Sequence, residues 1–290
     1  MTEPTGEYRS IWTWLRELEF RQGWCDAGGI RTRFAEAGDP DAPGVLLLHG
    51  TGGHWETFAP NLGPLSEHFH CVAVDMVGNG FSDKPDYDYE TDVYVRQLLA
   101  VMDHFGMERT SVVGMSLGAW VAARLALEVP ERVEKVVLMS PAGLVATASN
   151  MARIRAERTK AVNDPNWDSI KAMFDHLIAD ERNRLPDLVA LRQAIYQLPE
   201  TRETIDHLLI LQDPEARERN LLTEEQWSSI QAPTMVVASG KDFSEYGSTA
   251  HRVAALLPHS ELLEMSEVKH WPHFEDPDLF NAAALKFLRG

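Results

Sequence analysis

The sequence has little cysteine and no long apolar run. Only Cys25 and Cys71 occur among 290 residues, far apart and outside any Cys-x-x-Cys pair. This excludes a disulfide-stapled framework and favours a reduced, cytoplasmic setting. The longest mostly apolar segment, residues 136–148, is interrupted by Pro141 and Gly143 and is too short to cross a bilayer. The first residues contain acids and no continuous apolar stretch, so no secretory signal is expected.

Positive charge is also scarce. The chain carries 44 acidic and 27 basic side chains, for a formal net charge of −17. The resulting field repels phosphate backbones and anionic lipid surfaces, which disfavours nucleic-acid and membrane partners. A local basic pocket can still bind an anion at short range. No histidine spacing typical of a metal site is present. We therefore expect a small-molecule ligand, no metal and no cofactor, while a homo-oligomer stays possible.

Short apolar runs separated by helical patterns predict the fold class. The runs are nearly continuous rather than alternating, which is typical of strands buried on both faces of a parallel sheet. Residues 91–105 and 119–129 show helical patterns between them. Alternating strands and helices predict an α/β, doubly wound, mostly parallel sheet. The expected strands are Val45–Leu48, Cys71–Val74, Val112–Val113, Val136–Met139, Met235–Ala238 and, as a last core strand, Leu262–Met265.

Three other segments extend this core. Residues 20–26 and 30–35 meet at Gly28-Gly29, which predicts an antiparallel hairpin at the sheet edge. Residues 1–19 are interpreted as a helical N-terminal extension, whose segment IWTWLRELEF has an amphipathic pattern. Strand signals stop between residues 144 and 227, which predicts a helical lid inserted into a core of residues 1–143 and 228–290. Within that lid, residues 223–226 fit a capping box.

A serine between two glycines is the first candidate for chemistry. The apolar run at Val112–Val113 leads into Gly114-Met115-Ser116-Leu117-Gly118, and an apolar helical pattern follows. This Gly-x-Ser-x-Gly pattern between a buried strand and a buried helix is typical of a nucleophile elbow. The two glycines remove side chains that would collide across the sharp turn. We therefore expect Ser116 to present its hydroxyl at the strand tip.

A serine hydroxyl needs a base and an orienting acid, which in this fold class follow the serine in the order acid, then base. Asp242 follows the strand at residues 235–238 and is the expected acid, with Glu245 as the alternative. His270 follows the last expected strand and is the expected base, with His273 as its competitor. The predicted catalytic set is therefore Ser116, Asp242 and His270.

A glycine-rich loop, His49-Gly50-Thr51-Gly52-Gly53, directly follows the strand at residues 45–48. Its backbone N–H groups are candidates for an oxyanion hole, and the assigned donors are the N–H of Thr51 and the N–H of Leu117. A phosphate-binding loop is the alternative, but both GxGxxG and a Walker lysine are lacking. We expect Gly50, Gly52 and Met115 to contact the substrate.

Together, Ser116, Asp242, His270 and the glycine-rich loop resemble the α/β-hydrolase superfamily over essentially the whole chain. Two features are similar to the meta-cleavage-product hydrolases, which split a carbon–carbon bond in vinylogous 1,5-diketones. One is Trp271 directly after the histidine, and the other is LRQAIYQLPE, whose Arg192 falls about where that family has a lid arginine. The family commonly has asparagine where this chain has Met115.

The resemblance implies a cofactor-independent serine hydrolase that cleaves a carbon–carbon bond in a product of aromatic ring fission. Arg192 would then grip the substrate carboxylate and Trp271 would bound its apolar part. A solvated lid charge for Arg192 and simple packing for Trp271 are the alternatives. A carboxylesterase or lactonase acting on a small apolar ester stays open as a function. So does a small-molecule receptor built on the same scaffold.

Overall fold

The computed structural model describes residues 9–242 and 245–290, apart from the side chain of Glu245. Its centre is an eight-stranded sheet in the order β1-β2-β4-β3-β5-β6-β7-β8. Only β2 runs against the other strands, since β1 and β4 both pair with it antiparallel and all later pairs are parallel. The strands are β1 Phe20–Asp26, β2 Arg31–Ala37, β3 Gly44–Leu48, β4 His70–Val74, β5 Thr110–Met115, β6 Val133–Met139, β7 Thr234–Ser239 and β8 Ser260–Met265.

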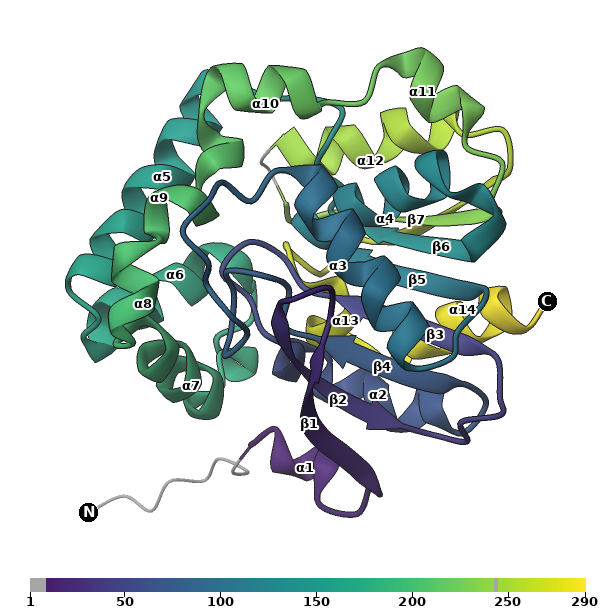
Figure 1. The fold of residues 1–290 in the computed structure, drawn as a ribbon, viewed down its shortest axis with the longest axis horizontal. Coiled ribbons are helices and arrows are strands. Elements are labelled where there is room, and N and C mark those ends of the chain that lie inside the picture. The colour runs from purple at the N-terminus through teal and green to yellow at the C-terminus, as the bar shows by residue number, and fades with distance from the viewer. Residues whose placement is uncertain (1–8, 243–244) are drawn as a thin grey trace.

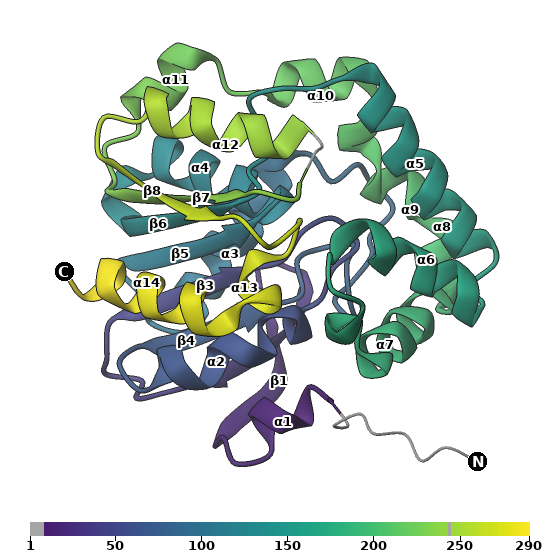
Figure 2. The same cartoon turned by 180° about the vertical axis from the view of Figure 1, so that it is seen from behind.

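Helices cover both faces of the sheet. In Figure 1, α3 lies in front of the strands, and in the reverse view of Figure 2, α2 and α14 lie together across the opposite face. The helices are α1 Trp12–Leu15, α2 Ala59–Ser66, α3 Thr91–His104, α4 Leu117–Glu128, α5 Ala148–Asn163, α6 Trp167–Leu177, α7 Pro186–Tyr196, α8 Pro199–Glu203, α9 Ile205–Leu208, α10 Pro214–Asn220, α11 Glu224–Ser229, α12 Glu245–Leu256, α13 Pro272–Glu275 and α14 Pro277–Arg289.

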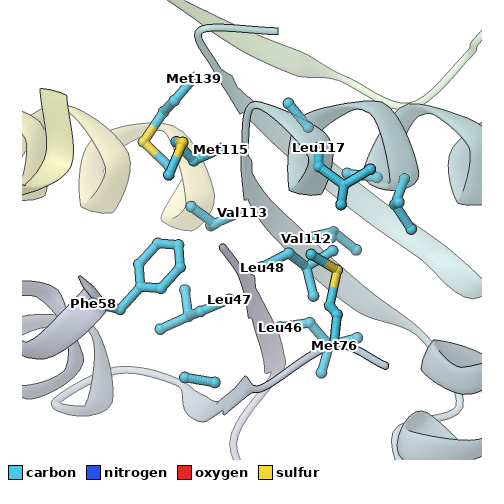
Figure 3. Packing of buried hydrophobic residues seen from close by; sticks show 14 of the residues in the cluster. Leu46, Leu47, Leu48, Phe58, Met76, Val112, Val113, Met115, Leu117 and Met139 are labelled. Atoms are coloured by element: carbon cyan, nitrogen blue, oxygen red, sulfur yellow. The ribbon is translucent and has the colours of Figure 1, made fainter. Parts of the chain in front are cut away.

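The central strands are buried on both faces, as their nearly continuous apolar runs predict. All six residues of β5 and all six of β7 are buried. Successive side chains of a strand point to opposite faces, so both faces need apolar partners. Figure 3 shows Leu47 beside Phe58 on one side of β3, and Leu46 beside Met76 on the other. The predicted mostly parallel, doubly wound sheet is confirmed.

The lid consists of the helices between β6 and β7. Figures 1 and 2 both show α5 to α9 standing to one side of the sheet, beyond the carboxyl ends of its parallel strands. The backbone N–H of Leu222 donates to the carbonyl of Gly143 at 2.9 Å, which joins the two ends of this segment. The predicted capping box is present, because Thr223 and Gln226 bond reciprocally at the start of α11.

Two expectations at the edges of the fold need correction. Within its described part, residues 9–19, the N-terminal segment forms a single turn of helix, α1, and Ile11 donates its backbone N–H to the lid residue Asp187 at 2.9 Å. The predicted last core strand exists as β8, but it is an edge strand and Leu262 is 43% exposed. The predicted hairpin is confirmed, with Gly28 and Gly29 both at positive φ. Among the described helices, none has the length and apolar character needed to span a membrane.

Candidate functional site

Ser116 lies in the sharp turn between β5 and α4, where its φ of 56° is in the left-handed region. Its two flanking glycines are required by close backbone approach. A Cβ on Gly114 would lie 2.3 Å from the carbonyl oxygen of Gly118, and a Cβ on Gly118 would lie 2.3 Å from that of Leu48. Both distances are far inside van der Waals contact. The chain therefore adopts the strained turn expected of a nucleophile elbow.

His270 and Asp242 meet at the carboxyl end of the sheet. Asp242 lies in the loop after β7 and His270 in the loop after β8, and their Nδ1 and Oδ2 atoms are 2.8 Å apart. Both side chains are nearly buried, which protects this hydrogen bond from competing water. A carboxylate on Nδ1 fixes the imidazole tautomer with its other nitrogen, Nε2, free to accept a proton. The geometry suits an acid–base pair.

The sequence offered His273 as an alternative base and Glu245 as an alternative acid. His273 is fully buried, its ring lies 4.7 Å from that of Phe58, and burial lowers its pKa to about 3. It is therefore a neutral packing residue. The side chain of Glu245, the alternative acid, lies outside the described residues.

Ser116 and His270 line the same cavity, but within the described residues no hydrogen bond joins the serine hydroxyl to the imidazole. Catalytic hydrogen bonds are often long before substrate binds and shorten in the complex. The full Ser116-His270-Asp242 relay therefore stays a prediction, of which the structure supplies the imidazole–carboxylate half.

The glycine-rich loop after β3 is held in a defined shape beside Ser116. His49 accepts the backbone N–H of Met76 at 3.0 Å, and its other ring nitrogen lies 2.7 Å from the carbonyl oxygen of Gly50. Burial lowers the pKa of His49 to about 4, so this histidine is neutral and donates to that carbonyl. The N–H of Gly52 donates to Asn79 at 2.7 Å. Loop geometry is thus fixed before any substrate binds.

The two assigned oxyanion donors stay available in this arrangement. Within residues 9–242 and 245–290, neither the backbone N–H of Thr51 nor that of Leu117 has a hydrogen-bond acceptor. Leu117 is the first residue of α4, where helix geometry leaves N–H groups unpaired. Thr51 lines the cavity. Both groups can therefore receive an oxyanion, and their role stays a prediction.

A cavity of about 320 Å³ lies between the sheet edge and the lid. The core contributes residues of the glycine-rich loop, the elbow and the loops after β7 and β8, while α5, α6 and α7 contribute the lid side. The lining residues are Gly50, Thr51, Gly53, Met115, Ser116, Arg153, Ile154, Glu157, Arg158, Met173, His176, Leu177, Arg192, Asp242, Tyr246, Lys269, His270 and Trp271. Of the predicted substrate contacts, Gly52 alone is outside this lining.

Arg192 is the most unusual residue of the cavity. It is only 1% exposed, and none of its three guanidinium nitrogens has a hydrogen-bond partner in the described chain. Its guanidinium carbon lies 5.6 Å from the ring centre of Phe174 and 5.7 Å from that of Tyr196. Burial, with the nearby charge of Arg158, lowers the pKa of Arg192 to about 10, so the group still carries its charge at neutral pH. The solvated-charge alternative is wrong.

Trp271 and Met115 both combine packing with a place in the cavity wall. Trp271 is 2% exposed and packs edge-on against Phe174 at 5.6 Å. Met115 is also 2% exposed, and its thioether lies close to Gly50. Both side chains line the cavity beside Ser116. They make this part of the wall apolar.

Sequence reasoning missed residues that support the site. Arg158 and Tyr246 line the cavity, and the ring of Tyr246 lies 4.9 Å from that of His270. Glu275 ties the histidine loop to the lid, because its carboxylate accepts the backbone N–H of Lys269 at 2.8 Å and that of Ala179 at 2.7 Å. Helical spacing does not mark Arg158 on α5 or Tyr246 on α12 as cavity-facing. Among the described residues, no group of three or more His, Cys, Asp or Glu side chains is arranged to hold a metal.

Comparisons with known proteins agree with this geometry. Residues 43–277 match the family described as the alpha/beta hydrolase fold. A 2-hydroxy-6-oxo-6-phenylhexa-2,4-dienoate hydrolase of Comamonas testosteroni is 28% identical over 91% of this chain and 93% of its own length. A 2-hydroxy-6-oxononadienedioate/2-hydroxy-6-oxononatrienedioate hydrolase of the same species is 30% identical, over 89% of this chain and 91% of its own.

A solved structure is similar over nearly the whole chain. The 2-hydroxy-6-oxo-6-phenylhexa-2,4-dienoate hydrolase of Rhodococcus sp. strain RHA1 superposes with a TM-score of 0.84. It shares 27% sequence identity, and the match covers 94% of this chain and 100% of that protein. The chain therefore has the α/β-hydrolase fold.

Proposed function

Because this chain is an enzyme of the α/β-hydrolase family, we propose that it is a serine hydrolase that cleaves a carbon–carbon bond in a vinylogous diketone bearing a carboxylate. Ser116 is the nucleophile, His270 the general base and then acid, and Asp242 the residue that orients His270. The relatives named above act on dienoates of this chemical class. Identity of about 30% leaves the particular substrate to experiment.

One observation carries the carboxylate part of this proposal, the unpartnered guanidinium of Arg192. The chain has 44 acidic residues, yet the described structure pairs none with this buried charge. A buried charge without a partner is costly, and it persists where a ligand supplies the counter-charge. Arg192 lines the cavity that holds Ser116, so the ligand reaches both residues. A carboxylate matches the planar fork of a guanidinium.

The reaction follows from what the cavity residues can do. A proton first moves from the dienol oxygen of the substrate to carbon, which converts the vinylogous acid into a ketone. Ser116 then attacks the distant carbonyl as His270 takes its proton, and the Thr51 and Leu117 N–H groups stabilise the oxyanion. The adjacent carbon–carbon bond breaks, its electron pair is delocalised through the intervening double bond into the carbonyl next to the carboxylate, and the resulting dienolate takes up the proton held by His270. Water finally releases the acyl group from Ser116.

Hydrolysis of an ester or lactone is the second candidate, and Met115 favours it. This side chain lines the cavity directly beside Ser116 and brings no hydrogen-bond donor to the developing dienolate. A simple acyl transfer needs no such donor, because its charge develops only on the oxyanion. The same three catalytic residues would perform it.

Parallel turnover measurements separate these functions. Purified protein is mixed with 2-hydroxy-6-oxo-6-phenylhexa-2,4-dienoate, whose colour is lost on cleavage, and with p-nitrophenyl butyrate, and Ser116→Ala protein serves as the control for both. We expect repeated bleaching of the dienoate that exceeds ester turnover and disappears in the variant. Rapid ester turnover without bleaching would instead establish the esterase. Binding without turnover of either compound would indicate a receptor.

A further inference from the structure

A second lid arginine faces the cavity without a carboxylate partner. Arg158 lies on α5, whereas Arg192 lies on α7, and both line the space that contains Ser116. Among the described residues Arg158 takes part in no ion pair: its guanidinium lies 3.6 Å from the thioether of Met173, and it also interacts with the uncharged phenol of Tyr196. A thioether is a weak acceptor, so the guanidinium retains most of its capacity to donate.

The two arginines converge on the same corner of the cavity through Tyr196. A Cβ on Gly52 would lie 2.6 Å from the Tyr196 hydroxyl oxygen and 3.9 Å from Arg158 Nε, which places both groups against the glycine-rich loop. Burial of Tyr196 would raise its pKa, but the charges of Arg158 and Arg192 outweigh burial and leave the phenol with a lowered pKa. The phenol is thus in the field of both guanidinium groups.

Other cations of the cavity wall are already satisfied. Arg153, one turn before Arg158 on α5, forms an ion pair with Glu157 at 3.0 Å. The Lys269 ammonium donates to the carbonyl of Asp175 at 3.0 Å. Of the three arginines that line the cavity, Arg158 and Arg192 are therefore the two without a carboxylate partner among the described residues. Two neighbouring like charges repel each other, and a single anion between them relieves the repulsion at both.

We propose that Arg158 and Arg192 bind one carboxylate of the substrate between them, so that the ligand joins α5 to α7 beside the glycine-rich loop. Each guanidinium donates to a carboxylate oxygen, as charge-assisted hydrogen bonds allow. The inference rests on the proposed function for the identity of the substrate, and it adds a second specificity-determining residue. It predicts strong selectivity for carboxylates over neutral molecules of the same shape.

Binding without turnover tests this directly. Benzoate and its neutral analogue benzamide are titrated calorimetrically into Ser116→Ala protein and into versions that also carry Arg158→Gln, Arg192→Gln or both. Arg155→Gln is the matched control, because Arg155 lies on the same helix but pairs with Asp206 and is outside the cavity lining. Thermal melting of every variant verifies that it is folded.

We expect benzoate to bind and benzamide to bind far more weakly. Arg158→Gln and Arg192→Gln should each weaken benzoate binding by roughly 10- to 100-fold. The double variant should bind benzoate only slightly more weakly than the single variant with the lower affinity. Both arginines contact the same carboxylate, so the effects of the two substitutions are not additive. Arg155→Gln should leave the affinity unchanged.

Two results would overturn the inference. In one, Arg158→Gln behaves like Arg155→Gln. In the other, Arg158→Gln weakens the binding of the dicarboxylate phthalate but leaves benzoate binding unchanged, which would mean that Arg158 binds a second, separate anionic group. No step of this test involves catalysis. If benzoate binding depends on both arginines but the protein does not bleach the dienoate, the proposed reaction alone is refuted. If the protein bleaches the dienoate but Arg158→Gln leaves benzoate binding unchanged, this inference alone is refuted.

Discussion

Replacement of Arg192 by methionine should stabilise the free protein while it removes substrate binding. The side chain is 1% exposed and its charge has no partner in the described chain. Methionine has a similar length, is flexible and carries no charge, so it can fill the space without a desolvation cost. Residues that bind substrate often lower the stability of the free protein, so that stability and function oppose each other.

The size of this effect follows from the pKa of Arg192. Burial and the nearby Arg158 lower it from 12.5 to about 10. Since one pKa unit corresponds to about 1.4 kcal/mol, the folded surroundings disfavour the charge by roughly 3 kcal/mol. Loss of the contacts with the Phe174 and Tyr196 rings offsets about 1–2 kcal/mol of this. We therefore expect Arg192→Met to raise the free energy of unfolding by about 1–2 kcal/mol.

Urea unfolding at pH 7 and thermal melting of the ligand-free protein measure this change, with an expected rise in Tm of roughly 2–5 °C. Arg217→Met is the matched control, because Arg217 is also buried but donates to the carbonyls of Leu211 at 3.1 Å and Val145 at 3.4 Å. That substitution leaves buried carbonyls without a donor and should be destabilising. Destabilisation by Arg192→Met of the same size as by Arg217→Met would refute the reasoning.

Three further predictions concern the elbow, a lid contact and a helix cap. Gly118→Ala places a Cβ 2.3 Å from the last carbonyl oxygen of β3, so we expect turnover to fall by about 100-fold or more while circular dichroism still reports a folded chain. Hydrogen bonds to Asp88 and Asp86 raise the pKa of His207 above 6.5. Stability from this contact is therefore complete below pH 6.5 and lost as the pH rises through the raised pKa, and the stability difference between wild type and His207→Gln should shrink in the same direction. Thr223→Ala removes the capping box of α11 and should cost about 1 kcal/mol in urea unfolding.

The elbow and the core strands could be predicted because their signals are local. Gly114 and Gly118 are required by backbone approach within a few ångströms, and the pattern that reveals them is five residues long. Asp242 and His270 follow from the rule that sites of parallel sheets lie at the carboxyl ends of strands, together with the order of the strands. Their partnership is long-range, but the fold class fixes it.

The lid could be predicted only as a helical segment. Arg153 and Arg158 lie on the same helix, and the i,i+4 spacing of Arg153 and Glu157 is typical of an ion pair, but no spacing shows that both arginines line the cavity or that Arg158 meets no carboxylate there. Such differences depend on how helices pack, which periodicity does not encode. The same limit applies to α1: in residues 9–19 the amphipathic pattern yields one helical turn, and the backbone N–H of Ile11, which precedes that turn, bonds to the lid residue Asp187. In β8 the pattern identifies a strand, and its place at the sheet edge leaves Leu262 exposed.

The central claim is that a carboxylate-bearing substrate lies between Ser116 and the lid arginines. A crystal structure of Ser116→Ala protein soaked with 2-hydroxy-6-oxo-6-phenylhexa-2,4-dienoate tests it most directly. The account predicts the carboxylate within hydrogen-bond distance, about 3 Å, of the Arg192 guanidinium, and the 6-oxo group beside the N–H groups of Thr51 and Leu117. A bound dienoate whose carboxylate faces solvent, with Arg192 left unpaired, would contradict it.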